Sequence, residues 1–182
     1  MKEEITTLSS KEIYRNKWMR LREDTIARAS GVEGIYSVVE KPDFAVIIPL
    51  DDNAVHVVEQ YRYPVSGRFI EFPQGTWDEQ PNVNPEELAR GELEEETGLS
   101  AEKMVYVGFQ YLAHGLSSQG YHIYLATGLT SGKQKLDPEE EGLTTSRLSI
   151  SEFEARIIGG EIKDATTCNA WGLAKLKGLI PS

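Results

Sequence analysis

The segment 84–98 most constrains the fold of this chain, because both ends of a helix are marked in its sequence. Asn84 is a good N-cap, and Pro85 suits the first helical position. Acidic residues follow in the first turn, as is typical of helix starts, and Gly98 is typical of a left-handed C-cap. We therefore predict a helix that begins at Pro85 and ends at Gly98.

The acidic run inside this segment places three carboxylates on one side of the helix. Glu92, Glu95 and Glu96 are spaced i, i+3 and i+4, so they are neighbours on a helical surface. At about 100° per residue they share that side with the apolar Leu88 and Leu93. A helix turns its apolar side toward the protein body. We therefore expect the three carboxylates to face inward.

The opposite side of the helix carries Arg90 and Glu94, spaced i and i+4, and we expect them to form a surface ion pair. A solvated face is the ordinary explanation of a glutamate-rich helix, but the inward direction of the other three carboxylates disfavours it. Half-buried carboxylates of like charge are costly unless a cation neutralises them. A hard divalent cation such as Mg²⁺ or Mn²⁺ suits oxygen ligands, and Mg²⁺ usually keeps sites for water and substrate phosphates. The pattern therefore predicts a metal site for phosphate chemistry.

Length and composition fit one domain with a small N-terminal extension. The 182 residues are 40% hydrophobic and carry a net charge of −10, with a pI near 4.9. This charge disfavours binding to nucleic acid or to anionic membranes. No apolar run is long enough to span a bilayer, the N-terminus lacks the features of a signal peptide, and the lone Cys168 fits a reducing cytosol. We expect a cytoplasmic protein without nucleic-acid or membrane partners.

The first forty residues favour a small antiparallel meander. The pattern is strand-like over 13–24, 24–29 and 35–40, with a turn at 30–34. Lys41, Pro42 and Asp43 break the pattern and are the best boundary. We therefore divide the chain into residues 1–42 and 43–182.

The rest of the chain is typical of an α/β fold, in which helices cover a mixed sheet. Besides the helix after Asn84, we expect helices at 151–158 and 166–178, and a hairpin turn at 51–53. Strands are expected at 44–50, 54–63, 68–72, 103–111 and 121–127.

The segment from Gly75 to Leu99 resembles the signature of the Nudix hydrolase family. That signature runs Gly, five residues, Glu, seven residues, then Arg-Glu-aliphatic-x-Glu-Glu-x-Gly-aliphatic. Gly75 matches its start, and its second half is matched by Glu92, Leu93, Glu95, Glu96, Gly98 and Leu99. The flanking segments 18–20, 57–64 and 71–75 look like the ADP-ribose pyrophosphatase branch, which splits nucleoside diphosphate sugars.

The resemblance implies a fold, an assembly and a metal centre. The fold is a Nudix α/β/α sandwich, and the N-terminal meander reaches over the partner in a homodimer and helps to build its nucleotide pocket. Glu92 and Glu96 would be direct metal ligands, and Glu95 a ligand or a carboxylate just outside the ligand set. The backbone carbonyl of Gln74 would be a further ligand.

The resemblance also implies where the catalytic groups lie. In this branch the general base usually comes from a later loop, and here residues 137–142 occupy that place. Glu139 or Glu141 is the candidate base, with the choice among these two and Glu140 left open. Glu95 is a further catalytic candidate.

Five residues are candidates for substrate contact on the same basis. Arg62 looks like the arginine that contacts the diphosphate, and Glu71 like a carboxylate near the metals. Trp18 and Arg20 would lie by the base across the dimer, and His114 falls in the substrate loop. A structural role for Trp18 or His114 is an equally good interpretation.

Two departures from the signature concern the orientation of Glu95. Gly91 stands where the family has arginine, and Arg90 points about 100° away, so it cannot take over. Another cation, such as Arg62 or Arg68, or a metal must then orient Glu95. Glycine inside a helix costs about 1 kcal/mol relative to alanine, so we expect another segment to approach Gly91 closely.

The second departure is an insertion between Gly75 and the helix, and the middle glutamate of the signature has no clear match; Asp78 or Glu79 is a possible substitute. The leading hypothesis is a Mg²⁺- or Mn²⁺-dependent hydrolase of nucleoside diphosphate sugars such as ADP-ribose. Its products would be a nucleoside monophosphate and a sugar phosphate. The alternatives are hydrolysis of a dinucleoside polyphosphate or a nucleoside triphosphate, and a nucleotide-sensing domain with little turnover.

Overall fold

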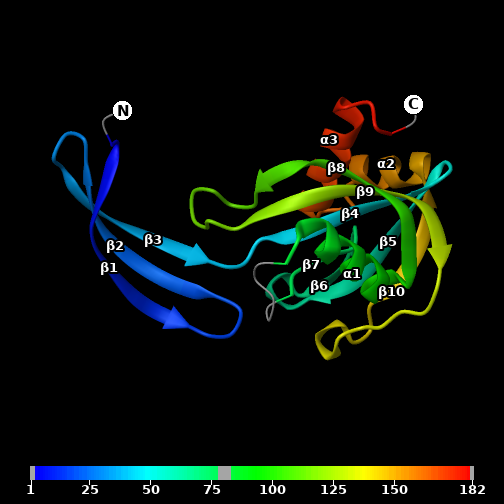
Figure 1. Cartoon of the computed structure of the whole chain (residues 1–182), viewed down its shortest axis with the longest axis horizontal. Helices are drawn as coiled ribbons and strands as arrows, with labels where there is room; N and C mark the ends of the chain where they lie inside the picture. Colours follow the sequence, from blue (N-terminus) through cyan, green and yellow to red (C-terminus); the bar gives the residue numbers. More distant parts are fainter. Residues whose placement is uncertain (1–2, 78–82, 181–182) are drawn as a thin grey trace.

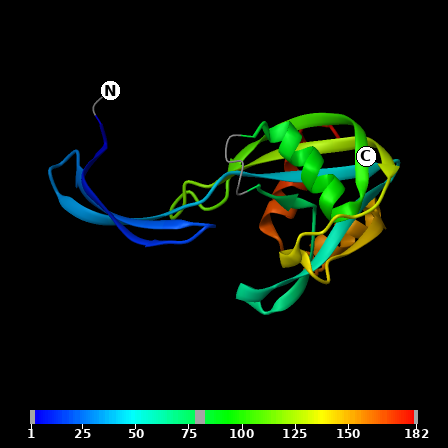
Figure 2. The same cartoon turned by 60° about the horizontal axis from the view of Figure 1, so that its bottom comes forward.

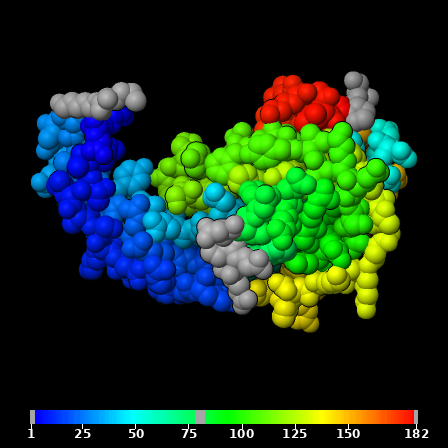
Figure 3. Space-filling view, viewed as in Figure 1, coloured from blue at the N-terminus to red at the C-terminus, as the bar shows by residue number. Residues whose placement is uncertain are grey.

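An antiparallel three-stranded sheet forms the N-terminal part of the computed structural model, which describes residues 3–77 and 83–180. The strands are β1 (Ile5–Arg15), β2 (Arg20–Arg28) and β3 (Glu33–Glu40), in the order β1-β2-β3. This sheet projects from the rest of the molecule, as the ribbon and the space-filling view both show (Figures 1 and 3). The predicted meander is confirmed.

The predicted strand over 13–24 is wrong, because the chain turns back within it. Asn16 causes the turn: its side-chain oxygen accepts the backbone N–H groups of Trp18 and Met19, both at 2.9 Å. Asparagine favours turns by such local hydrogen bonds. Residues 16–19 therefore connect two strands that pair with each other.

The second sheet has strand order β10-β5-β4-β9-β8, with β6 beside β5 and β7 beside β4. Its β4–β9 pair is parallel and its other pairs are antiparallel. The strands are β4 (Phe44–Asp51), β5 (Ala54–Arg62), β6 (Gly67–Glu71), β7 (Gln74–Gly75), β8 (Leu99–Tyr111), β9 (Gly120–Ser131) and β10 (Thr144–Ser149). The helices are α1 (Pro85–Thr97), α2 (Ile150–Ile158) and α3 (Ala165–Leu176), with short 3-10 turns at Tyr63–Val65 and Pro138–Glu140.

This sheet is the middle layer of an α/β/α sandwich, and strand β4 shows why. Its side chains alternate between the two faces: Ala45 and Ile47 pack with α1, while Val46 and Ile48 pack in the core under α2 and α3. All four side chains are fully buried. The turned view in Figure 2 shows α1 across one face of the sheet and the other two helices behind it. The expected α/β fold is confirmed.

Strand β10 has no counterpart in the predicted elements. It pairs with β5 at the edge of the sheet, and only Leu148 of its six residues is buried. Because an exposed edge strand needs no alternation of apolar and polar residues, its sequence Thr-Thr-Ser-Arg-Leu-Ser carried no strand signal.

Helix α1 has the predicted ends. The Asn84 side chain accepts the backbone N–H of Glu86 at 2.9 Å, and Gly98 has φ 71°. The expected Arg90–Glu94 pair is wrong. Arg90 binds Glu86 one turn earlier and the carbonyl of Ala101, and Glu94 binds Lys135. Arg90 thus takes the i, i+4 partner on its N-terminal side instead of the one on its C-terminal side, and the partner of Glu94 comes from a distant segment.

None of the helices in the described part of the chain has the length and apolar character that a membrane crossing needs.

Candidate functional site

Two glutamates of the acidic run, Glu92 and Glu96, lie against strand β7. Gly75 faces Glu92 so closely that a Cβ built on Gly75 would lie 2.2 Å from an oxygen of the Glu92 carboxylate. A side chain at position 75 would therefore displace this carboxylate. The backbone N–H of the neighbouring Gln74 donates to Glu96 at 3.0 Å. Strand β7 thus positions the two predicted ligands of α1.

A third carboxylate joins them from the loop before β10. Carboxylate oxygens of Glu92, Glu96 and Glu140 all lie within 4.8 Å of one another. Glu92 and Glu96 are buried, with 4% and 1% of their surface exposed, and Glu140 is half-buried. Asp137 caps the 3-10 turn that carries Glu140, which fixes the path of this loop.

Burial raises the pKa values of these carboxylates above their ordinary range. It raises the pKa of Glu92 to about 8, with a further contribution from the charge of Glu95. Burial and then the charge of Glu92 raise the pKa of Glu96 well above its ordinary value, and burial also raises that of Glu140. In each case, burial and neighbouring negative charge outweigh the contacts that favour the charged carboxylate.

The nearby cationic side chains form salt bridges with other carboxylates. Arg62 binds Glu71, Arg68 binds Glu59, and Lys135 binds Glu94 at the helix surface. The suggestion that Arg62 or Arg68 orients Glu95 is therefore wrong. Three clustered carboxylates with raised pKa values form a set of hard oxygen donors, and such a set fits Mg²⁺ or Mn²⁺.

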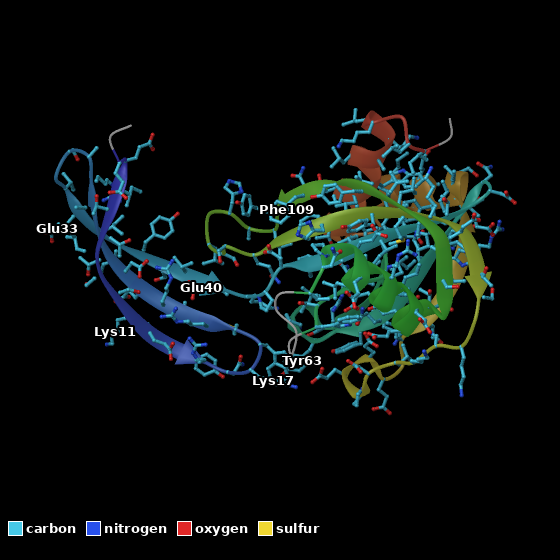
Figure 4. The ribbon with its side chains drawn as sticks, viewed as in Figure 1. Lys11, Lys17, Glu33, Glu40, Tyr63 and Phe109 are labelled. Atoms are coloured by element: carbon cyan, nitrogen blue, oxygen red, sulfur yellow. The ribbon has the colours of Figure 1, made fainter. Side chains whose placement is uncertain are left out.

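The three catalytic candidates from the sequence lie outside the cluster of Glu92, Glu96 and Glu140. Glu95 is half-buried, and its carboxylate accepts the indole N–H of Trp77 at 3.4 Å. Glu139 is exposed and forms a 3.0 Å salt bridge with Lys17, and Glu141 is exposed. Figure 4 shows Lys17 at the end of the N-terminal sheet that lies nearest the body. Of the loop triplet, it is Glu140 that the fold brings to the metal-site candidates.

A cavity of about 580 Å³ adjoins this cluster. Arg62, Glu71, Gln74 and Gly75 line it, so the cavity and the carboxylate cluster share strand β7. Lys41 and the residues around the start of α3 complete the polar wall, while Phe44, Val65, Phe69 and Leu112 supply an apolar wall. A hollow with apolar walls and a few directed polar groups is typical of a small-molecule site.

A half-exposed Arg62 and a buried Glu71 form an ion pair at the cavity wall. The Nε of Arg62 donates to Glu71 at 2.9 Å, and its Nη2 donates to the same carboxylate. Glu71 is only 3% exposed and also accepts the side-chain amide of Gln74 at 2.9 Å. This pairing holds the Arg62 guanidinium at the edge of the cavity and raises its pKa.

Gln74 connects the cavity wall to the start of α3. Its amide nitrogen donates to Asp164 at 3.2 Å, and its amide oxygen accepts the hydroxyl of Thr166 at 2.8 Å. Asp164 is also the N-cap of α3, where it accepts the backbone N–H of Thr167 at 2.8 Å. The N-cap residue of α3 therefore holds strand β7, which in turn positions the glutamates of α1.

The remaining substrate candidates do not line this cavity. Trp18 and Arg20 line a separate hollow of about 320 Å³ in the N-terminal sheet. Arg20 forms salt bridges there with Glu12 and Glu40, at 2.9 and 3.0 Å. His114 is exposed in the turn between β8 and β9. Within one chain, these three residues therefore do not line the cavity of Arg62 and Glu71, although Lys41 lines both hollows.

Sequence reasoning missed several residues of the site. Asp164 is detectable as a helix cap, but its contact with Gln74 depends on the packing of distant segments. Lys41 lies in the segment predicted only as a boundary, and Lys163 and Thr166 carried no motif. The suggested substitutes for the middle glutamate, Asp78 and Glu79, lie outside the described residues.

Comparison with known proteins agrees with this geometry. Residues 40–165 match the family model described as "NUDIX domain", and residues 5–39 match that described as "Nucleoside diphosphate sugar hydrolase N-terminal domain". A crystal structure described as that of an "ADP compounds hydrolase" has the same fold, with a TM-score of 0.84 and 20% identity, over 98% of each chain.

Three curated relatives are similar over most of their length. An ADP-ribose pyrophosphatase of Mycobacterium tuberculosis is 32% identical over 87% of this chain and 77% of the relative. That of Bacillus subtilis is 27% identical over 96% and 94%, and a GDP-mannose pyrophosphatase of Yersinia enterocolitica is 26% identical over 93% and 94%. The domain match covers more than half of the chain and includes the carboxylate cluster, so the chain belongs to the Nudix family and is a pyrophosphohydrolase.

Proposed function

We propose that this enzyme hydrolyses the diphosphate bond of nucleoside diphosphate sugars such as ADP-ribose, with Mg²⁺ or Mn²⁺ as cofactor. The observation that carries the proposal is the buried carboxylate cluster beside a cavity that contains a fixed arginine. The printed names of the relatives, two ADP-ribose pyrophosphatases and a GDP-mannose pyrophosphatase, support this substrate class.

Glu92 and Glu96 would hold the metal, with Glu95 and the carbonyl of Gln74 as further candidates, and Glu140, whose carboxylate lies within 4.8 Å of both, is kept for the base. A bound divalent metal would neutralise charge on the diphosphate and lower the pKa of a water molecule. The protein contributes fixed positions, because Gly75 leaves room for the Glu92 carboxylate and the Gln74 N–H holds Glu96. Holding these buried carboxylates ionised without a cation costs free energy, and their raised pKa values reflect this cost.

Arg62 is the proposed diphosphate contact. Glu71 accepts hydrogen bonds from Nε and Nη2 of Arg62 and so orients the guanidinium, and Lys41 and Lys163 add positive charge along the same cavity. Such cations suit an anionic substrate in a protein whose net charge is negative. The general base is proposed to come from the loop triplet of Glu139, Glu140 and Glu141, and the proximity of the Glu140 carboxylate to Glu92 and Glu96 supports Glu140 among the three.

We also propose a homodimer in which the N-terminal sheet covers the partner. Strand β1 is exposed along its whole length, and it carries exposed apolar side chains at Ile5, Leu8 and Ile13. A second copy would cover this surface, and it would bring Trp18, Arg20 and His114 toward the neighbouring substrate cavity.

A substrate panel tests the function. The purified protein is incubated with Mg²⁺ and ADP-ribose, GDP-mannose, a dinucleoside polyphosphate or a nucleoside triphosphate, and the products are separated by chromatography. The proposal expects a nucleoside monophosphate and a sugar phosphate from the first two substrates. It is wrong if both stay intact while a triphosphate or dinucleoside polyphosphate is cleaved, or if the protein binds these nucleotides without turnover.

A further inference from the structure

The Trp77 ring occupies the space that a side chain at position 91 would need. A Cβ built on Gly91 would lie 2.0 Å from Cζ2 of Trp77 and 2.8 Å from Cη2. No residue other than glycine therefore fits here without moving the ring. Glycine inside a helix weakens the helix, so its presence in the middle of α1 is explained by the approach of this indole.

The same ring donates a hydrogen bond to Glu95. The indole N–H of Trp77 lies 3.4 Å from Oε2 of Glu95, a long but directed contact. Positions 91 and 95 are one helical turn apart and face each other on the surface of α1. The Trp77 ring packed on Gly91 therefore occupies the place beside Glu95 that a long side chain at position 91 would otherwise occupy.

The cations around Glu95 have other carboxylate partners. Arg90 binds Glu86, and Lys135 binds Glu94 at 2.6 Å. Among the hydrogen bonds of the described residues, the indole N–H is the one side-chain donor to the Glu95 carboxylate. Glu95 in turn lies close enough to influence the cluster, because its charge helps to raise the pKa of Glu92 and Glu140.

We propose that Trp77 is a positioning residue for the metal site: its indole N–H orients Glu95, and Gly91 exists to admit the ring. The inference rests on the proposed function in so far as Glu95 serves the metal. Because the indole donor is neutral, it orients the carboxylate without cancelling its charge. The full charge of Glu95 then remains available to the cation.

Metal binding without substrate tests the proposal. Trp77→Phe keeps an aromatic ring against Gly91 but removes the donor, and we expect Mn²⁺ affinity measured by calorimetry to fall about 10- to 100-fold. At saturating Mn²⁺, the KM for the substrate should stay unchanged, because the cavity wall is formed by other residues. Gly91→Ala keeps both partners but displaces the ring, so it should lower the affinity in the same way. The double variant with Trp77→Phe and Gly91→Ala should lose little more Mn²⁺ affinity than either single variant.

Trp171→Phe is the matched control. Its indole also donates to a glutamate, Glu154 at 3.1 Å, but it lies in the core on the opposite face of the sheet. The same loss of a donor should leave the Mn²⁺ affinity unchanged there. If Trp77→Phe binds Mn²⁺ as tightly as the unaltered protein, the proposal is overturned.

The contact itself is tested by NMR of the three tryptophan indole groups. Glu95→Ala should shift the indole N–H signal of Trp77, and Glu154→Ala that of Trp171. An unmoved Trp77 signal in Glu95→Ala would also overturn the proposal. These measurements are independent of the substrate: a protein that binds Mn²⁺ but cleaves no nucleotide sugar refutes the proposed function alone. If the protein binds no Mn²⁺, the metal role of both proposals falls, and the NMR result still decides the contact.

Discussion

Burial and charge oppose each other at Glu92 and Glu96. Each carboxylate is almost fully buried next to another acidic group, and the pKa of each is raised. A core position of this kind would be more stable with a neutral side chain. The proposed cation would supply the missing positive charge, and the two positions would then be a case of stability sacrificed for function.

The first prediction concerns the pH dependence of the metal-free protein. The pKa of Glu92 rises from its ordinary value of 4.5 to about 8 on folding, so the folded state binds this proton more tightly than the unfolded state. The stability contributed by this bound proton is therefore fully present below pH 4.5, and it is lost as the pH rises through about 8. In EDTA above that pH, Glu92→Gln should raise the free energy of unfolding measured in urea. Glu87→Gln, an exposed change on the same helix, should leave it unaltered.

The second prediction is that Glu96→Gln removes activity without unfolding the protein. Loss of a metal ligand removes several kcal/mol of transition-state stabilisation, which corresponds to a fall in kcat on the order of a thousandfold or more. Circular dichroism should be unchanged, since the amide can keep the contact with the Gln74 N–H. Unchanged turnover would refute the assignment of Glu96 to the metal.

The third prediction separates the glutamates of the loop before β10. Glu140 lies in the carboxylate cluster, whereas Glu139 pairs with Lys17 and Glu141 is exposed. In kinetic assays, Glu140→Gln should lower kcat by about 10²- to 10⁴-fold, the usual contribution of a general base. The matched variants Glu139→Gln and Glu141→Gln should change it far less. A larger loss in either matched variant would transfer the role to that residue.

Helix α1 depends on its C-terminal glycine at the scale of the element. Gly98 has φ 71°, and a Cβ there would lie 2.9 Å from the backbone nitrogen of Gln134 and 3.0 Å from the carbonyl oxygen of Gly132. Both the left-handed backbone and the crossing segment exclude a side chain.

The fourth prediction compares two Gly→Ala changes by urea unfolding. Gly98→Ala should destabilise the protein by at least about 1–2 kcal/mol, from backbone strain alone. Gly172→Ala lies inside helix α3, where the added Cβ meets nothing within 4 Å, and should stabilise the protein by about 0.5–1 kcal/mol. Equal effects of the two changes would contradict this account of α1.

At the scale of the whole molecule, the N-terminal sheet stands apart from the sandwich (Figure 3). Its outer strand buries none of its residues, whereas a small sheet is stable only when its apolar face is buried. A second copy of the chain would supply that layer.

The fifth prediction tests this assembly. The unaltered protein should have the mass of a dimer in light scattering, and the double change Leu8→Lys with Ile13→Lys should shift it toward the monomer, because it introduces charge into an apolar contact. Ile158→Lys, a change at an exposed apolar residue on α2, is the control and should leave the mass unchanged. A monomeric unaltered protein would refute the dimer.

The sequence by itself determined the helix and the direction of its carboxylates. Caps, apolar spacing and the i, i+3, i+4 pattern are local properties of the chain, so α1 and the burial of Glu92 and Glu96 could be predicted from them. The close approach to Gly91 was also predictable, because a glycine inside a helix has a measurable cost.

Only the tertiary structure decided which groups meet these carboxylates. Glu140 reaches Glu92 and Glu96 from a later loop, Trp77 reaches Glu95 from the segment before the helix, and Asp164 reaches the supporting Gln74 from the start of α3. The ion pair of Glu94 with Lys135 was decided in the same way, whereas Arg90 pairs with Glu86 at helical spacing and also donates to the carbonyl of Ala101 outside the helix. Local patterns fix how an element presents its side chains, whereas packing between distant elements fixes what those side chains touch.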